Sequence, residues 1–408
     1  MRRSVMRLGY LYSRYPVLSQ TFCDTEMLEL ERRGLELSIA SMYPPKTPLR
    51  HEYLAHLRAA VHYAPEKPAM EALAEKAKRK GRWPEALIAQ HEGNYGPEYK
   101  AALRARNALF FVELFERERI RHFHVHFTNR AAHTALFVKA ISGIPFSVTA
   151  HGQDFMVDLG NDELLREICA GAEFVGAETD YSRGLLAARC PASAEKIFRI
   201  YNGMDLKKFD RAMESLRSPG PVRLLSVGRL VAFKGCNVLI DACSELRRNG
   251  LEFACEIIGD GPLRGALETQ IAQHDLANHV RLSGERPQSY VLASLAGCDL
   301  FVLAATVDER GASDVFPTVI AEAMTSGKAV VSSTVAGIPE LVAQDETGFL
   351  VPREDPRALA GALRRLIEDA ALRKDFGRNG RRRIETHFTI EKTIEPLLSR
   401  FTKTDAAH

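Results

Sequence analysis

The sequence predicts an α/β protein with two domains, each built around a parallel sheet. Its 408 residues exceed the roughly 100–200 residues of one typical domain. Short apolar runs, which read as strands, alternate with longer amphipathic segments, and this order implies parallel strands with right-handed helical crossovers. The alternation begins again after residue 221, so a second domain of similar class is expected.

The N-terminal domain is expected over residues 1–205. A strand at 5–11 leads into a helix at 21–33 and a strand at 35–42. The stretch 65–120, rich in Ala, Glu, Lys and Arg, interrupts this rhythm and predicts a helical excursion. The rhythm then returns with expected strands at 123–127, 144–150, 173–177 and 196–201.

The C-terminal domain is expected over residues 206–388. The boundary is indicated by the polar stretch that ends at Arg211 and by Ser-Pro-Gly-Pro at 218–221. The amphipathic residues within 389–408 predict a final helix. Strands are expected at 222–227, 253–258, 280–282, 299–303 and 329–332, with helices at 236–248, 262–273 and 318–326.

Composition narrows the classes of function. A net charge of +3 is too small to indicate nucleic acid as a partner. The seven cysteines are odd in number, form no C-x-x-C pair, and fit free thiols of a reducing compartment. The sequence has neither a signal-length apolar start nor a run of about 18 apolar residues, so we expect a cytoplasmic protein.

A basic cluster in the excursion has two interpretations. It is an ordinary solvated helix face, or it makes peripheral contact with the anionic inner face of the membrane. The cluster lies beside Trp83 and comprises Lys76, Lys78, Arg79, Lys80 and Arg82.

The first motif with chemical content follows the strand at 222–227. Gly228 allows a tight turn, Gly235 lies just ahead of the next helix, and Arg229 and Lys234 lie on the loop between them. Ligands of α/β proteins bind at this carboxyl edge of the sheet. Two cations beside free helix amides predict a diphosphate site, and the alternative is an ordinary basic surface loop.

The second motif starts a helix. Pro317 suits a first helical turn, and the amides of Thr318 and Val319 face an incoming anion. Glu322, about one turn on, has the oxygens to accept hydrogen bonds from a diol such as ribose. Asp314 has the same chemistry for sugar hydroxyls. The alternative interpretation makes Asp314 a cap of the helix or of its loop and Glu322 an ordinary helix carboxylate.

A third motif carries a histidine. His151 and Asp154 follow the strand at 144–150, where a polar loop suits a ligand, although a packed histidine is the alternative. His122, His124 and His126 alternate along one strand and so share a face. Such a pattern occurs in metal sites, but no carboxylate or cysteine follows at a metal-like spacing and Asp-x-Asp is absent. We therefore expect no metal.

Two turns complete the set. An Asn-Gly turn at 202–203 ends a strand, and Gly259-Asp-Gly261 ends another. The latter lacks the third glycine of a dinucleotide fingerprint, where Arg264 stands, which disfavours a NAD-dependent dehydrogenase.

These motifs together resemble retaining glycosyltransferase family 4, which has the GT-B fold of two Rossmann-like domains facing each other across a cleft. The N-terminal half is similar to bacterial exopolysaccharide transferases related to colanic acid synthesis. The resemblance covers nearly the whole chain except about 65–120. It rests on Gly-Arg-Leu…Lys-Gly, Phe-Pro…Glu-Ala-Met…Gly, Ala-Gly-Ile-Pro-Glu (336–340) and the segments 345–352, 15–22, 124–127 and 144–152.

The resemblance implies a role for each candidate residue. Asp314 stands where the family usually has Glu, and Val315 replaces a usual Gly, so the identity of the sugar stays open. Asp314 and His151 are the expected catalytic residues. The expected ligands of the donor diphosphate are Arg229, Lys234, Thr318 and Val319, and the ribose is expected to bind Glu322. The donor sugar is expected to contact Asp314, Phe316, Pro317 and His151, and the nucleobase is expected near Ser283 and Gly284. The residues expected in cleft loops are Ser19, Gln20, Thr21, Asp154 and Asn202.

The implied reaction is retaining transfer of a hexose-type sugar from a UDP-, GDP- or ADP-sugar, without a metal or cofactor. The acceptor is a glycan, a lipid-linked sugar or a small molecule held mainly by the N-terminal domain, and the setting is cell-surface polysaccharide synthesis. Two alternatives remain: a nucleotide-sugar epimerase of GT-B fold, and a non-catalytic nucleotide-sugar binder.

Overall fold

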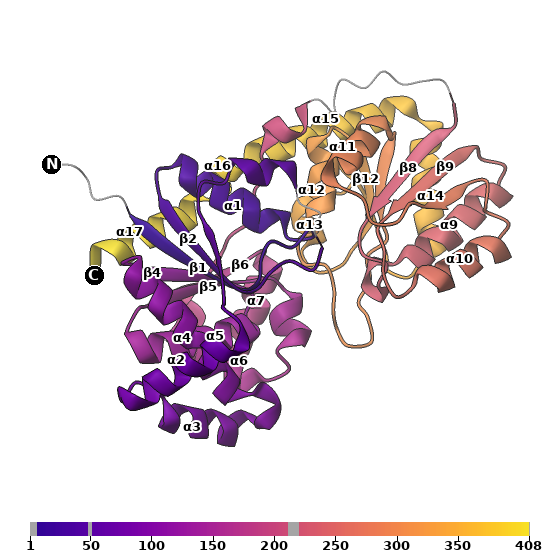
Figure 1. Cartoon of the computed structure of the whole chain (residues 1–408). Coiled ribbons are helices and arrows are strands. Elements are labelled where there is room, and N and C mark those ends of the chain that lie inside the picture. Colours follow the sequence, from indigo (N-terminus) through magenta and orange to yellow (C-terminus); the bar gives the residue numbers. More distant parts are fainter. Residues whose placement is uncertain (1–5, 48–50, 211–219, 408) are drawn as a thin grey trace. The chain divides into compact units, whose positions relative to one another are not determined.

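Both expected parallel sheets are present, one in each of two units (Figure 1). The computed structural model describes residues 6–47, 51–210 and 220–407. Unit 1 comprises Met1–Tyr201 with Thr393–His408, and unit 2 comprises Asn202–Lys392. Arg211 and residues 218–219 of the expected boundary lie outside the described residues. The α/β class with two Rossmann-like sheets is thus confirmed.

Unit 1 contains a seven-stranded sheet in the order β3-β2-β1-β4-β5-β6-β7, and every recorded strand pair is parallel. The order reverses between β1 and β4, which places a topological switch point there. The strands are β1 (Arg7–Arg14), β2 (Glu36–Tyr43), β3 (Val61–Tyr63), β4 (His122–His126), β5 (Phe146–Ala150), β6 (Val175–Ala177) and β7 (Ile197–Arg199).

Helices cover both faces of this sheet (Figure 1). One face carries α1 (Thr21–Arg32) and α17 (Glu395–Ala407), whose Phe401 packs on His122 and His124. The main core lies on the other face, around Phe111 and Phe123. Its helices are α2 (Lys67–Arg79), α3 (Glu85–Tyr95), α4 (Ala101–Arg117), α5 (Arg130–Ser142), α6 (Asp162–Gly171) and α7 (Asp180–Arg189).

Unit 2 contains a six-stranded parallel sheet in the order β10-β9-β8-β11-β12-β13. Its order reverses between β8 and β11. The strands are β8 (Val222–Val227), β9 (Phe253–Ile258), β10 (Val280–Leu282), β11 (Leu300–Leu303), β12 (Ala329–Ser333) and β13 (Gly348–Val351). The helices are α9 (Cys236–Arg248), α10 (Arg264–Gln273), α11 (Gln288–Gly297), α12 (Thr318–Thr325), α13 (Ile338–Leu341), α14 (Pro356–Glu368) and α15 (Ala370–His387). The short helix α16 (Ile390–Thr393) contains the boundary between the two units.

The sequence pattern did not predict two of the strands. The edge strand β3 has three residues, half exposed, which is too short for an alternation to stand out. The strand β13 begins at Gly348, where a Cβ would lie 2.2 Å from the carbonyl oxygen of Val330. A glycine is required at that close approach between strands, and in the sequence it indicates a turn, so the strand was not predicted.

The basic cluster of the excursion is largely paired. Lys76 lies 2.6 Å from Glu113 and Lys78 lies 2.8 Å from Glu75. Arg82 forms an ion pair with Glu116. These pairs reduce the free positive charge on α2 and the turn after it, which favours the solvated-face interpretation.

Candidate active site

Unit 2 gathers most of the predicted donor-binding residues on two loops, one after β8 and one after β11. These strands flank the point where the strand order reverses. In open α/β sheets, ligands bind outside the carboxyl ends of the strands at this point. Arg229 and Lys234 belong to the first loop, and Asp314 and Phe316 to the second.

Glycines allow the two loops to pack tightly. Gly235 has φ +64°, and a Cβ there would lie 1.7 Å from the carbonyl oxygen of Ala304, just after β11. Gly259 has φ +141°, and a Cβ there would lie 1.9 Å from the carbonyl oxygen of Gly228. No side chain fits at either distance, so the backbone itself fixes where the cationic loop lies.

The two predicted diphosphate cations lie around one aromatic ring. The Arg229 Cζ is 5.7 Å and the Lys234 Nζ 5.8 Å from the centroid of the buried Phe233 ring. Arg229 is exposed, whereas the Lys234 side chain retains 12% exposure. Cation–π contact at these distances holds both charges on the same small surface.

Lys234 and Asp314 form an ion pair. The Lys234 Nζ lies 2.8 Å from Oδ1 and 2.7 Å from Oδ2 of Asp314. The two residues were predicted for different parts of the donor, the diphosphate and the sugar. No side chain caps α12 among the described residues, so Asp314 does not cap this helix.

The start of α12 offers free donors. Pro317 precedes the helix, and within the described chain no acceptor is recorded for the amides of Thr318 and Val319. Phe316 packs against Phe388 with ring centroids 5.8 Å apart, which supports the loop before the helix. Unpaired first-turn amides and the helix dipole favour an anion at this position.

Glu322 lies one turn into α12 and is partly buried. Burial raises its pKa from 4.5 to about 7, although Lys208 acts in the opposite direction. Near neutral pH this carboxyl is therefore shared between its acid and its ionised form, and its oxygens suit the hydroxyls of a diol.

The predicted nucleobase region lies at the end of β10. The amide of Gly259 donates to the carbonyl oxygen of Gly284 at 2.9 Å. The hydroxyl of Ser283 donates to Glu256. With these groups engaged, the region is an ordered strand end next to the glycine turn after β9.

In unit 1 the predicted His151 belongs to a buried hydrogen-bonded chain. Its Nδ1 lies 2.9 Å from Oε1 of Glu178, and its Nε2 lies 2.9 Å from Nδ1 of His126. The Nε2 of His126 lies 3.1 Å from Oε1 of Glu26, which also accepts a 2.6 Å hydrogen bond from the Tyr10 hydroxyl. Both ring nitrogens of His151 are thus engaged within the protein.

The carboxylates around His151 favour its charged form. Burial opposes the charged form of His151, but Glu178, Asp154 and Glu26 outweigh it, so the pKa of His151 is raised.

Asp154, predicted in a cleft loop, joins two strand ends. Its carboxylate accepts hydrogen bonds from the backbone amides of Thr128, His151 and Phe155. It is 2% exposed, so it fixes the loops after β4 and β5.

Ser19, Gln20 and Thr21 stand at the start of α1, and the buried Oε1 of Gln20 has no hydrogen-bond partner among the described residues. Asn202 is the first residue of unit 2.

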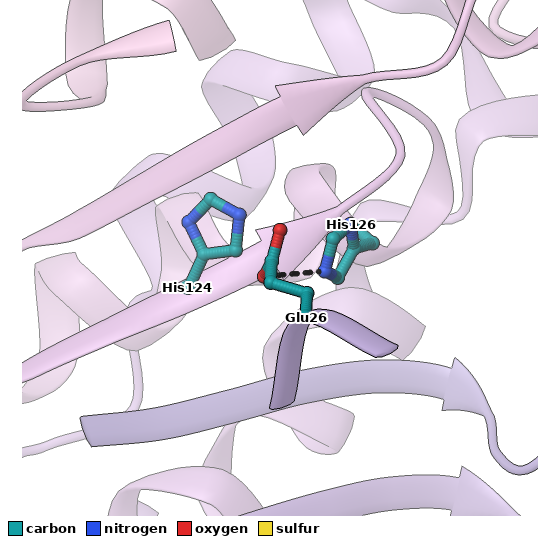
Figure 2. A group of neighbouring side chains, drawn as sticks. All are labelled: Glu26, His124 and His126. Atoms are coloured by element: carbon teal, nitrogen blue, oxygen red, sulfur yellow. Dashed lines mark hydrogen bonds and ion pairs between the residues drawn. The ribbon is translucent and has the colours of Figure 1, made fainter. Parts of the chain in front are cut away.

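A group of potential metal ligands lies beside the same chain. Glu26, His124 and His126 each bring one ligand atom within 4.8 Å of the others (Figure 2). The carboxylate that the sequence spacing lacked is therefore supplied by α1. However, His124 Nδ1 lies 2.8 Å from the Ser147 hydroxyl and its Nε2 lies 3.0 Å from the Thr149 hydroxyl. Hydrogen bonds account for these histidines without a metal.

Sequence reasoning missed Glu26, Glu178 and the pairing role of His126. Glu178 directly follows β6, so the rule that selected His151, a polar residue at a strand's carboxyl end, also selects it. Glu26 lies in the middle of α1 and carries no such signal, because its contact with β4 depends on how the helix packs.

Comparison with known proteins agrees with this geometry. Residues 20–208 match the family model for Glycosyltransferase Family 4, and residues 208–383 match the one for glycosyl transferases group 1. The amylovoran biosynthesis glycosyltransferase AmsK of Erwinia amylovora is 29% identical over 94% of this chain and 96% of its own length. The putative colanic acid biosynthesis glycosyltransferase WcaL of Escherichia coli K12 is 28% identical over 88% of this chain and 90% of its own.

Solved structures share the fold. Alr3699/HepE of Anabaena, in complex with UDP, superposes with a TM-score of 0.73 at 19% identity, over 98% of this chain and 100% of that one. Among the described residues, no helix is both long and apolar enough to cross a bilayer. Two family models that together span residues 20–383, and relatives that match along nearly their whole length, show that the chain belongs to the family 4 glycosyltransferases of GT-B fold.

Proposed function

We propose that this chain is a retaining, metal-independent hexosyltransferase that uses a UDP-sugar in the synthesis of a bacterial exopolysaccharide. The observation that carries the proposal is the Lys234–Asp314 ion pair, which lies beside Arg229 at the sheet's switch point. The names of AmsK and WcaL support the exopolysaccharide setting, and the UDP complex of Alr3699/HepE supports the nucleotide.

The diphosphate of the donor binds Arg229, Lys234 and the free amides at the start of α12. Charge-assisted hydrogen bonds of this kind contribute about 1.5–3 kcal/mol each. Asp314 then exchanges part of its contact with Lys234 for a hydroxyl of the sugar. Glu322 holds the ribose, and backbone at Ser283 and Gly284 borders the base.

Departure of the diphosphate leaves negative charge on oxygen, and the two cations and the helix start stabilise it. No metal is needed for that purpose. Retention follows from front-face attack, in which the acceptor hydroxyl gives its proton to the leaving phosphate oxygen. The same proposal includes contact of His151 with the transferred sugar and binding of the acceptor by unit 1.

Titration calorimetry with UDP, GDP and ADP tests the donor assignment. We expect UDP to bind most tightly, and Arg229→Gln to weaken it by about ten-fold or more. Arg223→Gln is the matched control, because Arg223 lies on the same strand, β8, but near its amino end. Preferred binding of GDP or ADP, or equal losses in the two variants, would contradict the assignment.

The proposed retention of configuration is tested on a product of the reaction. NMR of the sugar released or transferred from UDP-glucose reports the configuration of its anomeric carbon, which we expect to be retained. An inverted product would refute retention. Conversion of UDP-glucose into an epimer without an acceptor would identify an epimerase, and binding without any turnover would identify a binding protein.

A further inference from the structure

Three arginines and an exposed tyrosine share the carboxyl edge of the unit 1 sheet. Arg14 ends β1 and Tyr43 ends β2. Arg104 lies in the first turn of α4, and Arg130 is the first residue of α5. Because α4 leads into the parallel strand β4 and α5 leads out of it, both helices begin at this edge. Four separate elements therefore bring these residues together.

These side chains lie within contact or electrostatic reach of one another. The Arg14 Cζ is 5.2 Å from the centroid of the Tyr43 ring, and Tyr43 is 46% exposed. Burial lowers the pKa of Arg104, Arg130 lowers it further, and Tyr43 acts in the opposite direction. No carboxylate contributes to this balance among the described residues.

Among the residues that the structure describes, Arg104 and Arg130 have no ion-pair partner. The Nε of Arg104 is buried and finds no acceptor in the part of the chain that the structure describes. Arg130 stands at a helix start, where the dipole already favours an anion. Partly buried guanidinium groups are normally paired, so this cluster suits an anion from outside the chain.

We propose that Arg104, Arg130 and Tyr43 form an acceptor subsite that binds an acidic sugar, with a carboxylate or a phosphate as its anionic group. Guanidinium groups match either anion through paired N–H donors. The exposed Tyr43 ring offers an apolar face against which a sugar ring packs. This inference rests on the proposed function, because it assigns the ligand to the acceptor of the transfer reaction.

Calorimetry with three probes tests the subsite: phenyl β-D-glucuronide, α-D-glucose 1-phosphate and the neutral phenyl β-D-glucoside. The protein is first saturated with UDP, so that the phosphate probe does not enter the diphosphate site. We expect one anionic probe to bind at least about ten-fold more tightly than the glucoside. The probe that binds identifies the anionic group as a carboxylate or a phosphate.

Variants assign the binding to the cluster. Arg104→Gln and the exposed Arg130→Gln are each expected to weaken the anionic probe by about ten-fold. Arg106→Gln is the matched control, since Arg106 is on the same helix and its Nε is also buried without a described partner. Two positions along a helix point about 200° apart, so this variant is expected to bind like the wild type.

Two results would overturn the subsite. The first is equal affinity of the wild type for the charged and neutral probes. The second is unchanged affinity of Arg130→Gln for the anionic probe, together with equal losses of affinity in Arg104→Gln and Arg106→Gln. Failure of the wild type to bind UDP would instead count against the proposed donor. In that case the probes are titrated in the absence of UDP, so that failure of the subsite is distinguished from failure of the proposed donor.

Discussion

Lys234 and Asp314, 80 positions apart in the chain, meet as an ion pair with both carboxylate oxygens within 2.8 Å of the ammonium nitrogen. Their side chains keep 12% and 14% of their exposure, so the pair is largely shielded from water. The pairing holds Lys234 in position before a donor arrives. It also means that a diphosphate competes with Asp314 for the same cation.

Asp314→Asn separates these two effects. Without the carboxylate, Lys234 is free for phosphate, so UDP affinity is expected to stay the same or to rise a few-fold. Turnover of the UDP-sugar is expected to fall by about ten-fold or more, because the contact between the carboxylate and the sugar is lost. Calorimetry with UDP and a kcat/KM measurement report the two effects. The exposed Glu309→Gln, in the same loop, is the control, and a parallel loss of UDP binding in Asp314→Asn would contradict this reasoning.

Glu322→Gln tests the raised pKa. A carboxyl whose pKa is higher in the folded protein stabilises it below the unfolded value, 4.5, and loses that contribution as pH rises to about 7. The wild type is therefore expected to lose up to about 3 kcal/mol over this window relative to Glu322→Gln. Above pH 7 the difference stays constant.

Denaturant unfolding of both proteins at pH 4.5, 6, 7 and 8.5 measures that difference. The exposed Glu368→Gln, on α14, is expected to show no such window. A pH-independent difference between wild type and Glu322→Gln would show that the carboxyl titrates normally. In the same variant, UDP binding above pH 7 is expected to weaken about ten-fold, because the ionised oxygens no longer accept from the ribose.

Much of the fold was predictable because its signals are local. Apolar runs and the glycines that follow them mark the strands and their carboxyl ends, so Arg229, Lys234 and His151 could be selected from sequence. Which of them meet could not be predicted. The Lys234–Asp314 and Glu26–His126 contacts span 80 and 100 positions, and they depend on strand order and on the packing of α1 across the sheet.

Glu178→Gln tests the raised pKa of His151. The pKa of His151 is raised in the folded protein, so its contribution to stability is full below the unfolded value, near 6.5, and is lost as pH rises through the folded value. We expect Glu178→Gln to be less stable than the wild type at pH 5.5, with a smaller difference at pH 9. Urea unfolding at both values measures this, and Glu173→Gln, at the exposed Lys139 pair, serves as control. A larger difference at pH 9 would contradict the assigned charge.

Chelation tests the absence of a metal requirement. Glu26, His124 and His126 could gather around a cation, but their atoms are already joined to Tyr10, Ser147, Thr149 and His151 by hydrogen bonds. A metal would have to displace these bonds. We expect EDTA to leave UDP binding and sugar turnover unchanged, and added Zn²⁺ not to raise the Tm. Loss of activity on chelation that Zn²⁺ or Mg²⁺ restores would refute metal independence.

Gly235→Ala tests whether the close backbone approach positions the diphosphate loop. The added Cβ would lie 1.7 Å from the carbonyl oxygen of Ala304, at a φ of +64°. The loop must therefore move or unit 2 must lose stability, by more than about 3 kcal/mol. Gly250→Ala has the same kind of backbone strain, φ +72°, but nothing within 4 Å of its Cβ, and is expected to cost about 1–2 kcal/mol. The two variants differ in the clash of the added Cβ. Loss of UDP binding in Gly235→Ala alone would show that the close approach to Ala304 positions the diphosphate loop. Equal UDP binding in the two variants would refute this role.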